Sequence, residues 1–298
     1  MLRELDYFTW APPAPPVMKT SAMSATPRVP MLGVDAHAHV FDRSLAMVAE
    51  RRYSPDYDAT LAQWLGHLDR CGLSHGVLVQ PSFLGTDNSH LLHALQAAPQ
   101  RLRGVAVVEP TISATQLQRM ARLGVVGIRL NLMGQALPDL TSPAWRPLLE
   151  QVAELGWHVE LHRPIEDIPC LVNKLAVYGC KVVIDHFGRP RASFGAQHAT
   201  FQDMLGLGAS GNVWVKVSGV YRLGGTHSEN LSFARAAVPM LIEHFSCERL
   251  VWGSDWPHTQ HEAEVDYAGQ FALFEERVPW QAQRQTILCQ GAQALFGF

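Results

Sequence analysis

Eight short runs rich in β-branched residues, separated by amphipathic stretches, constrain the fold of this chain more than any other feature of its sequence. Each run is nearly continuous in apolar residues and ends in polar ones, which is typical of parallel strands buried on both faces. The stretches between them, such as DATLAQWLGHLDRCG and SPAWRPLLEQVAELG, carry apolar residues at helical spacing. The runs cover residues 33–39, 75–80, 103–110, 125–132, 157–162, 181–186, 213–219 and 249–255.

Glycines stand where several predicted helices give way to the next strand, at Gly72, Gly124, Gly156 and Gly179. Glycine is the preferred residue at such a joint because the C-terminal cap of a helix adopts a left-handed conformation. Repeated strand–helix units of this kind predict an α/β protein, a single (β/α)8 TIM barrel over residues 31–298 with no second domain. Residues 1–30 are rich in proline and lack the apolar segment of a signal peptide, so they predict an extended N-terminal arm.

Composition and charge narrow the classes of partner. The 298 residues are 47% hydrophobic and 17% charged, enough to bury a large core. A net charge of -3 without a Lys/Arg-rich run argues against binding to nucleic acid or an anionic membrane, and no apolar run is long enough to span a bilayer. The 5 cysteines are scattered without a Cys-x-x-Cys pair, which favours free thiols and a cytoplasmic location. A small-molecule substrate is the expected partner, and a homo-oligomer remains open.

The ends of the predicted strands carry an unusual set of side chains. Alternate residues of a strand share a face, so a histidine pair one residue apart points its rings the same way. In a barrel of this kind, functional groups gather at the C-terminal ends of the strands. A single histidine there is more often a hydrogen-bonded core residue, but four of them together with an aspartate predict a site. The residues are His37, His39, His162, His186 and Asp255.

Three motifs carry a resemblance to a known family. They are DAHAHVF (35–41), DHFGRP (185–190) and WGSDWPH (252–258), each at the end of a predicted strand. Together the motifs resemble the amidohydrolase superfamily, and the likeness extends over most of residues 33–298. Within that superfamily the chain is similar to lactone hydrolases of the 2-pyrone-4,6-dicarboxylate lactonase type. The resemblance implies a barrel fold and hydrolysis of a cyclic ester.

Lactone hydrolysis needs a base that activates water and an electrophilic group that polarises the carbonyl. The carboxylate of Asp255 is the predicted base. His37, His39 and His186 are the remaining predicted catalytic residues, because imidazoles can donate hydrogen bonds to a carbonyl or bind a metal ion.

The sequence leaves the presence of a metal open. His37, His39, His162 and Asp255 would supply three nitrogens and one oxygen, a set suited to one zinc or manganese ion. The arrangement resembles that of metal-dependent members of the superfamily, which have a histidine at the end of the fifth strand. The dicarboxylate lactonase looks like a metal-free variant of the superfamily and has a tyrosine at that position, where this chain has His162.

Several residues match substrate-binding positions of the lactonases. Arginine binds carboxylates through two parallel hydrogen bonds, so arginines at the barrel mouth predict an anionic substrate. A further arginine of the family is replaced here by Gln135, which removes one positive charge, so a lactone with one carboxylate or a sugar-acid lactone stays open beside a 2-pyrone-4,6-dicarboxylate-like lactone. The predicted substrate-binding residues are Arg129, Arg189, Arg222, Tyr53 and Ser82.

Two alternatives to a lactone hydrolase remain open. Related amidohydrolase barrels with a similar histidine and aspartate set are metal-dependent decarboxylases of carboxylated aromatic-type substrates. A non-catalytic ligand-binding barrel is the third interpretation, since the presence of catalytic residue types does not by itself establish turnover.

Overall fold

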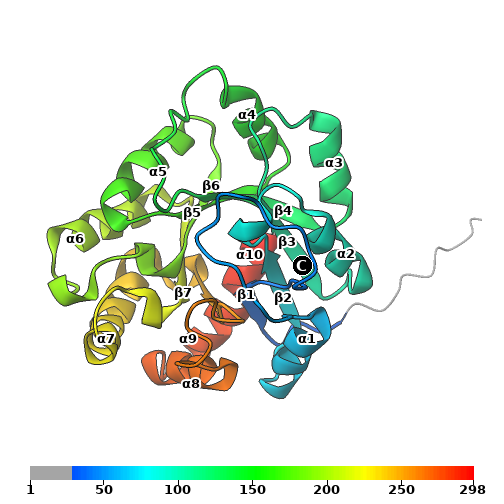
Figure 1. The fold of residues 1–298 in the computed structure, drawn as a ribbon. Coiled ribbons are helices and arrows are strands. Elements are labelled where there is room, and N and C mark those ends of the chain that lie inside the picture. Colours follow the sequence, from blue (N-terminus) through cyan, green and yellow to red (C-terminus); the bar gives the residue numbers. More distant parts are fainter. Residues whose placement is uncertain (1–28) are drawn as a thin grey trace, which may run out of the picture.

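The computed structural model describes residues 29–298, which form a barrel of parallel strands surrounded by helices (Figure 1). The strands lie in chain order, and each pairs in parallel with the next. Every predicted run overlaps one strand, although several of the runs extend beyond the strand ends, and the arrangement confirms the predicted (β/α)8 barrel. The strands are β1 Val34–Ala38, β2 His75–Val79, β3 Leu102–Ala106, β4 Val125–Asn131, β5 His158–His162, β6 Lys181–Ile184, β7 Val213–Ser218 and β8 Leu250–Gly253.

Helices cover the outside of the strands, as the amphipathic stretches predict (Figure 1). The predicted proline-rich arm lies almost wholly outside the described residues and stays a prediction. No helix of residues 29–298 has the length and apolar character needed to cross a membrane. The helices are α1 Leu61–Arg70, α2 Ser89–Ala97, α3 Ala114–Arg122, α4 Arg146–Glu154, α5 Ile168–Ala176, α6 Ala199–Gly206, α7 His227–Phe245, α8 Tyr267–Arg277, α9 Gln281–Gln285 and α10 Ala292–Phe296.

The four predicted glycine joints follow the ends of α1, α3, α4 and α5. Gly72, Gly124, Gly156 and Gly179 have φ values of 68°, 97°, 68° and 71°, in the left-handed region where a side chain is disfavoured. The glycines therefore let each helix stop and the chain turn directly into the next strand.

The barrel closes between its first and last strands. The Asp255 backbone N–H donates to the His37 carbonyl at 2.8 Å, and the His39 N–H donates to the Trp256 carbonyl at 2.8 Å. Gly253 permits this approach, because a Cβ there would lie 2.5 Å from the Cβ of His37. Closure thus places the histidine pair directly beside the predicted base.

The N-terminal end of the barrel is filled with apolar side chains. Leu295 and Phe296 of α10 pack against Val34, Ala36 and other strand residues that point inward. In the view of Figure 1, α10 lies at the centre of the ring of strands. The barrel is therefore closed at this end, and the opposite end is left for a site.

An irregularity in β1 turns the histidine pair into the barrel. The pairing of β1 with β2 shifts between Asp35 and Ala38, which is the mark of a β-bulge. Ala36 packs in the inner apolar cluster and His37 contacts Lys216 across the barrel, so two successive residues face inward. Regular alternation from Ala36 would send both histidines outward.

Candidate active site

A cleft of about 650 Å³ opens at the C-terminal ends of the strands. The predicted histidines and aspartate reach it from strand ends that lie far apart in the sequence, and His37 lies fully buried beside them. All five predicted substrate-binding residues line the cleft as well. The predicted residues on its wall are His39, His162, His186, Asp255, Arg129, Arg189, Arg222, Tyr53 and Ser82.

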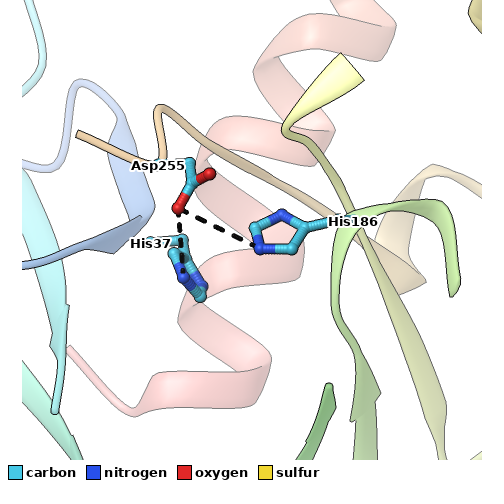
Figure 2. A group of neighbouring side chains, drawn as sticks. All are labelled: His37, His186 and Asp255. Carbon is cyan, nitrogen blue, oxygen red and sulfur yellow. Dashed lines mark ion pairs between the residues drawn. The ribbon is translucent and has the colours of Figure 1, made fainter. Parts of the chain in front are cut away.

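Asp255 stands at the centre of the histidines. Its Oδ1 lies 3.7 Å from His37 Nε2, 3.7 Å from His39 Nε2 and 4.0 Å from His186 Nε2. Figure 2 shows the His37 and His186 rings beside this carboxylate, His37 from β1 and His186 from the segment just after β6. Its φ of 59° is left-handed, a strained conformation that aspartate tolerates better than most residues.

The other carboxylate oxygen of Asp255 is held by two donors. Tyr221 Oη donates to Oδ2 at 2.7 Å, and Arg222 Nε donates to the same atom. Burial raises the pKa of Asp255, but the charge of Arg222, together with weaker influences that include a hydrogen bond from His39, lowers it by more, so the pKa lies well below the usual value. The carboxylate is therefore ionised at neutral pH, with Oδ1 directed at the three imidazoles.

The histidines predicted to be catalytic are held by different partners. His39 Nδ1 donates to the Val79 carbonyl at 2.8 Å, and His186 Nδ1 lies 2.8 Å from Ser218 Oγ. Burial lowers the pKa of His186 to about 3, although Asp255 and Asp185 act in the opposite direction. Burial, with Lys216 next, lowers the pKa of His37 well below the usual value. Both rings are therefore neutral at pH 7.

A buried carboxylate that the sequence analysis did not select ties the two halves of the site together. Asp35 accepts from the Ser254 backbone N–H at 2.8 Å, from Ser254 Oγ at 2.6 Å and from Tyr267 Oη at 3.0 Å. These bonds join β1 to the segment after β8, one residue before Asp255. The sequence did offer a signal for Asp35, because this residue is the first of the DAHAHVF motif and stands two residues before His37.

Two of the three predicted arginines already have a carboxylate partner. Arg129 binds Asp185 Oδ2 through Nε at 2.9 Å and Nη2 at 2.8 Å, and Arg222 is paired with Asp255. Arg189 differs, since no carboxylate in residues 29–298 lies within 4.0 Å of its guanidinium. Burial, followed by the charge of Arg222, lowers the pKa of Arg189 to about 10. Arg189 therefore has no carboxylate partner of its own in residues 29–298, although the charge of Asp255 acts to raise its pKa.

Sequence reasoning missed a fourth arginine, Arg52. It lines the cleft and donates from Nη2 to Asn131 Oδ1 at 3.0 Å, and in the described chain it too has no carboxylate partner. The adjacent Tyr53 signalled this segment, but the sequence could not show which of Arg51 and Arg52 faces the cleft. Gln135, which replaces the family arginine, does not line the cleft.

Tyr53 connects two loops over the cleft. Its hydroxyl donates to Glu262 Oε1 at 2.5 Å, and Tyr57 Oη donates to the same oxygen at 2.6 Å. The contacts join the segment after β1 to the segment after β8. Ser82 lines the cleft from the segment after β2, next to Phe83, whose ring lies 6.3 Å from that of Tyr53.

The potential metal ligands fall into two groups within the described residues. One contains His37, His186 and Asp255, and the other His37, Glu160 and Asp185, with ligand atoms within 4.8 Å of one another in each group. His162 belongs to neither, and both of its ring nitrogens are buried without a hydrogen-bond partner. The structure therefore does not assemble the predicted set of four as one group. The spacing of the first group would allow it to hold an ion.

Comparison with known proteins places the chain in a family. The model of the amidohydrolase family matches residues 34–298, so the chain belongs to this family of (β/α)8 barrel enzymes.

Particular relatives carry more specific descriptions. The chain is 33% identical over 280 residues to 2-pyrone-4,6-dicarboxylate hydrolase of Comamonas testosteroni, covering 90% of this chain and 91% of that protein. A crystal structure from Pseudomonas putida, assigned as a 2-pyrone-4,6-dicarboxylic acid hydrolase, is 55% identical with a TM-score of 0.86, covering 90% and 98%.

Two further structures show how far the similarity of this chain to known proteins extends. A probable 2-pyrone-4,6-dicarboxylic acid hydrolase from Acinetobacter baumannii, with citric acid bound, is 43% identical with a TM-score of 0.87, covering 90% of this chain and 100% of that one. The 2,6-dihydroxybenzoate decarboxylase from Rhizobium, at 16% identity and a TM-score of 0.63, covers 89% and 98% and shares the fold alone.

Proposed function

We propose that this protein hydrolyses the ring ester of a lactone that carries two carboxylates, such as 2-pyrone-4,6-dicarboxylate. The observation that carries the proposal is the pair of guanidinium groups without a carboxylate partner in residues 29–298, Arg52 and Arg189, in a cleft whose floor holds the ionised Asp255. Arg189 is half-buried and Arg52 more exposed at the cleft wall, and a bound anion would give both guanidinium groups a carboxylate partner. The lactone hydrolases among the relatives and the citric acid bound to one of them support an acidic cyclic substrate.

The arginines would bind and orient the substrate. A carboxylate accepts two parallel hydrogen bonds from a guanidinium, which fixes direction as well as position. Arg52 supplies a cation that the sequence does not reveal, so the argument for a single carboxylate, drawn from Gln135, loses its basis. The two cleft arginines without a carboxylate partner, Arg52 and Arg189, instead favour a dicarboxylated lactone over a sugar-acid lactone.

The reaction would begin at Asp255 Oδ1. This oxygen takes a proton from water, and the resulting hydroxide attacks the lactone carbonyl carbon. Arg222 and Tyr221 hold Oδ2 and thus keep Oδ1 directed into the cleft. Imidazole N–H groups near the carbonyl stabilise the negative charge that develops on its oxygen.

Ring opening completes the step. The bond between the carbonyl carbon and the ring oxygen breaks, and the departing oxygen receives the proton that Asp255 took from water. The product is the open-chain acid, with one more carboxylate than the substrate. No step of this sequence requires a metal ion.

A panel of three substrates tests the proposal. The rate of ring opening is measured for 2-pyrone-4,6-dicarboxylate, for a pyrone with one carboxylate, and for a sugar-acid lactone. We expect the dicarboxylate to give the highest kcat/KM, because it alone engages both unpaired arginines. Equal or higher kcat/KM for either of the others contradicts the proposed substrate class, and release of carbon dioxide would support the decarboxylase instead.

A further inference from the structure

Lys216, in the middle of β7, has no role in the proposed steps of lactone hydrolysis. Its Nζ lies 2.5 Å from Glu160 Oε1, 2.8 Å from His37 Nδ1 and 3.2 Å from Asp185 Oδ1. All four side chains are fully buried. An ammonium group has three protons and no acceptor, and here three acceptors surround it.

The contact with Lys216 decides which nitrogen of His37 carries the proton. Because an ammonium group can only donate, His37 Nδ1 must accept and is unprotonated. The single proton of the ring is then on Nε2, which lies 3.7 Å from Asp255 Oδ1. His39 is anchored in the opposite sense, since its Nδ1 donates to the Val79 carbonyl.

We propose that Lys216 is a positioning residue that holds His37 as an Nε2–H donor toward the lactone carbonyl and withholds Nε2 from a metal ion. A metal ligand must offer a lone pair, and Nε2 in this arrangement carries a proton instead. The role toward the carbonyl rests on the proposed function. The assignment of the proton does not, because it follows from the contacts of Lys216.

The ammonium group also occupies the second group of potential metal ligands. His37, Glu160 and Asp185 surround Nζ, so the positive charge that a metal ion would bring is already present in the chain. With Arg129 paired to Asp185, two cations balance two carboxylates below the cleft. Removal of Lys216 alone would leave a buried carboxylate unpaired and endanger folding.

The first test reads the proton position in the unaltered protein. Nitrogen-15 NMR of histidine-labelled protein distinguishes the two tautomers, and the His37 signals are assigned by their loss in His37→Gln. We expect a proton on Nε2 of His37 and on Nδ1 of His39, unchanged after equimolar Zn²⁺ is added. A proton on His37 Nδ1, or loss of the Nε2 proton when zinc is added, overturns the inference whether or not any lactone is a substrate.

The second test measures the consequence for catalysis. The double variant Lys216→Met with Glu160→Gln removes one cation and one anion together, so the buried charge stays balanced. We expect kcat to fall about 10² to 10³-fold, the effect of removing one donor to a developing oxyanion, with KM changed less than about threefold. Lys181→Met, a change of the same type on β6, is the control and should retain wild-type kcat. A double variant that folds and keeps wild-type kcat overturns the positioning role.

Discussion

The two ends of this barrel bury the same residue type for different purposes. At the N-terminal end, His158 packs its ring 5.4 Å from that of Phe296 and lies 3.4 Å from Glu160. At the C-terminal end, His37 and His186 direct their Nε2 atoms at Asp255 beside an open cleft. Burial and residue type are alike at the two ends, so only the neighbours distinguish the proposed catalytic histidines from a packed one.

The ends also differ in backbone conformation. His186, Arg189, Asp255 and His258 all have positive φ, and all lie just beyond strands at the C-terminal end. Residues held in this region cost about 1 to 3 kcal/mol each and persist where the surrounding structure fixes them. Backbone strain and unpaired charges therefore lie around the cleft, whereas the other end of the barrel is stabilised by apolar packing. Substitutions at the two ends should separate activity from stability.

The largest expected effect is the loss of the base at the C-terminal end. Asp255→Asn keeps the shape of the side chain but cannot take a proton from water, so kcat should fall on the order of 10³ to 10⁴-fold. KM should change little, because the arginines that bind the carboxylates remain. Steady-state kinetics, with circular dichroism to verify folding, measures this. Turnover near the wild-type rate would show that another group is the base.

The matching change at the N-terminal end should affect stability instead. Phe296→Ala removes a ring that is 1% exposed and should lower the free energy of unfolding by about 3 to 5 kcal/mol. Urea unfolding measures the loss, and kcat of the folded fraction should equal that of wild type. A large drop in kcat without loss of stability would break the proposed division between the ends.

Arg189 tests whether an unpaired cation binds substrate. Arg189→Met should raise KM about 10 to 100-fold, the effect expected from losing a charged hydrogen bond, with a smaller change in kcat. Arg191→Met is the matched control, because Arg191 is exposed and its guanidinium lies 5.8 Å from the Phe194 ring. If the two variants have equal KM values, Arg189 does not bind the substrate.

Arg52 should give a smaller effect of the same kind. Its Nη2 is already engaged by Asn131, so Arg52→Met should raise KM about 3 to 10-fold. Arg51→Met is the control, since Arg51 binds Val48 and Ser54 outside the cleft. A dependence of this effect on the number of substrate carboxylates would identify the group that Arg52 binds, and no change for any substrate would remove Arg52 from the site.

The smallest expected effect is that of pH near neutrality. A base whose pKa is depressed stays deprotonated above that pKa, and activity is lost only when pH falls through it. With the Asp255 pKa well below its usual value and the His186 pKa at about 3, kcat/KM should be flat between about pH 5 and 8. An inflection near about pH 6.5 would instead identify a titrating histidine as the base.

The sequence was sufficient for the fold, because each strand is an apolar run and each joint a glycine. It also located the strand-end histidines, Asp255 and the arginines at one mouth, since a parallel barrel brings all strand ends together. The sequence could not show which charged side chains form ion pairs with one another. Whether Arg129 faces Asp185 or solvent, and whether Arg52 or Arg51 enters the cleft, depends on loop paths and side-chain directions that carry no periodic signal.

The prediction of a metal site was limited for the same reason, because side-chain contacts cannot be read from the sequence. His162 has the residue type and strand-end position of a ligand, yet it belongs to neither group of potential ligands in the described chain. Lys216 lies on one of the predicted strands, but its contact with His37 joins residues 179 positions apart. Only the closed barrel shows that an ammonium group stands beside the histidine pair.

The most direct measurement of the central claim is mass analysis of the product formed from 2-pyrone-4,6-dicarboxylate in water labelled with oxygen-18. The account predicts a product heavier than the substrate by one labelled water, with the label in a newly formed carboxylate, and no such product with Asp255→Asn. A product lighter by one carbon dioxide, or unchanged substrate with the wild-type protein, would contradict it.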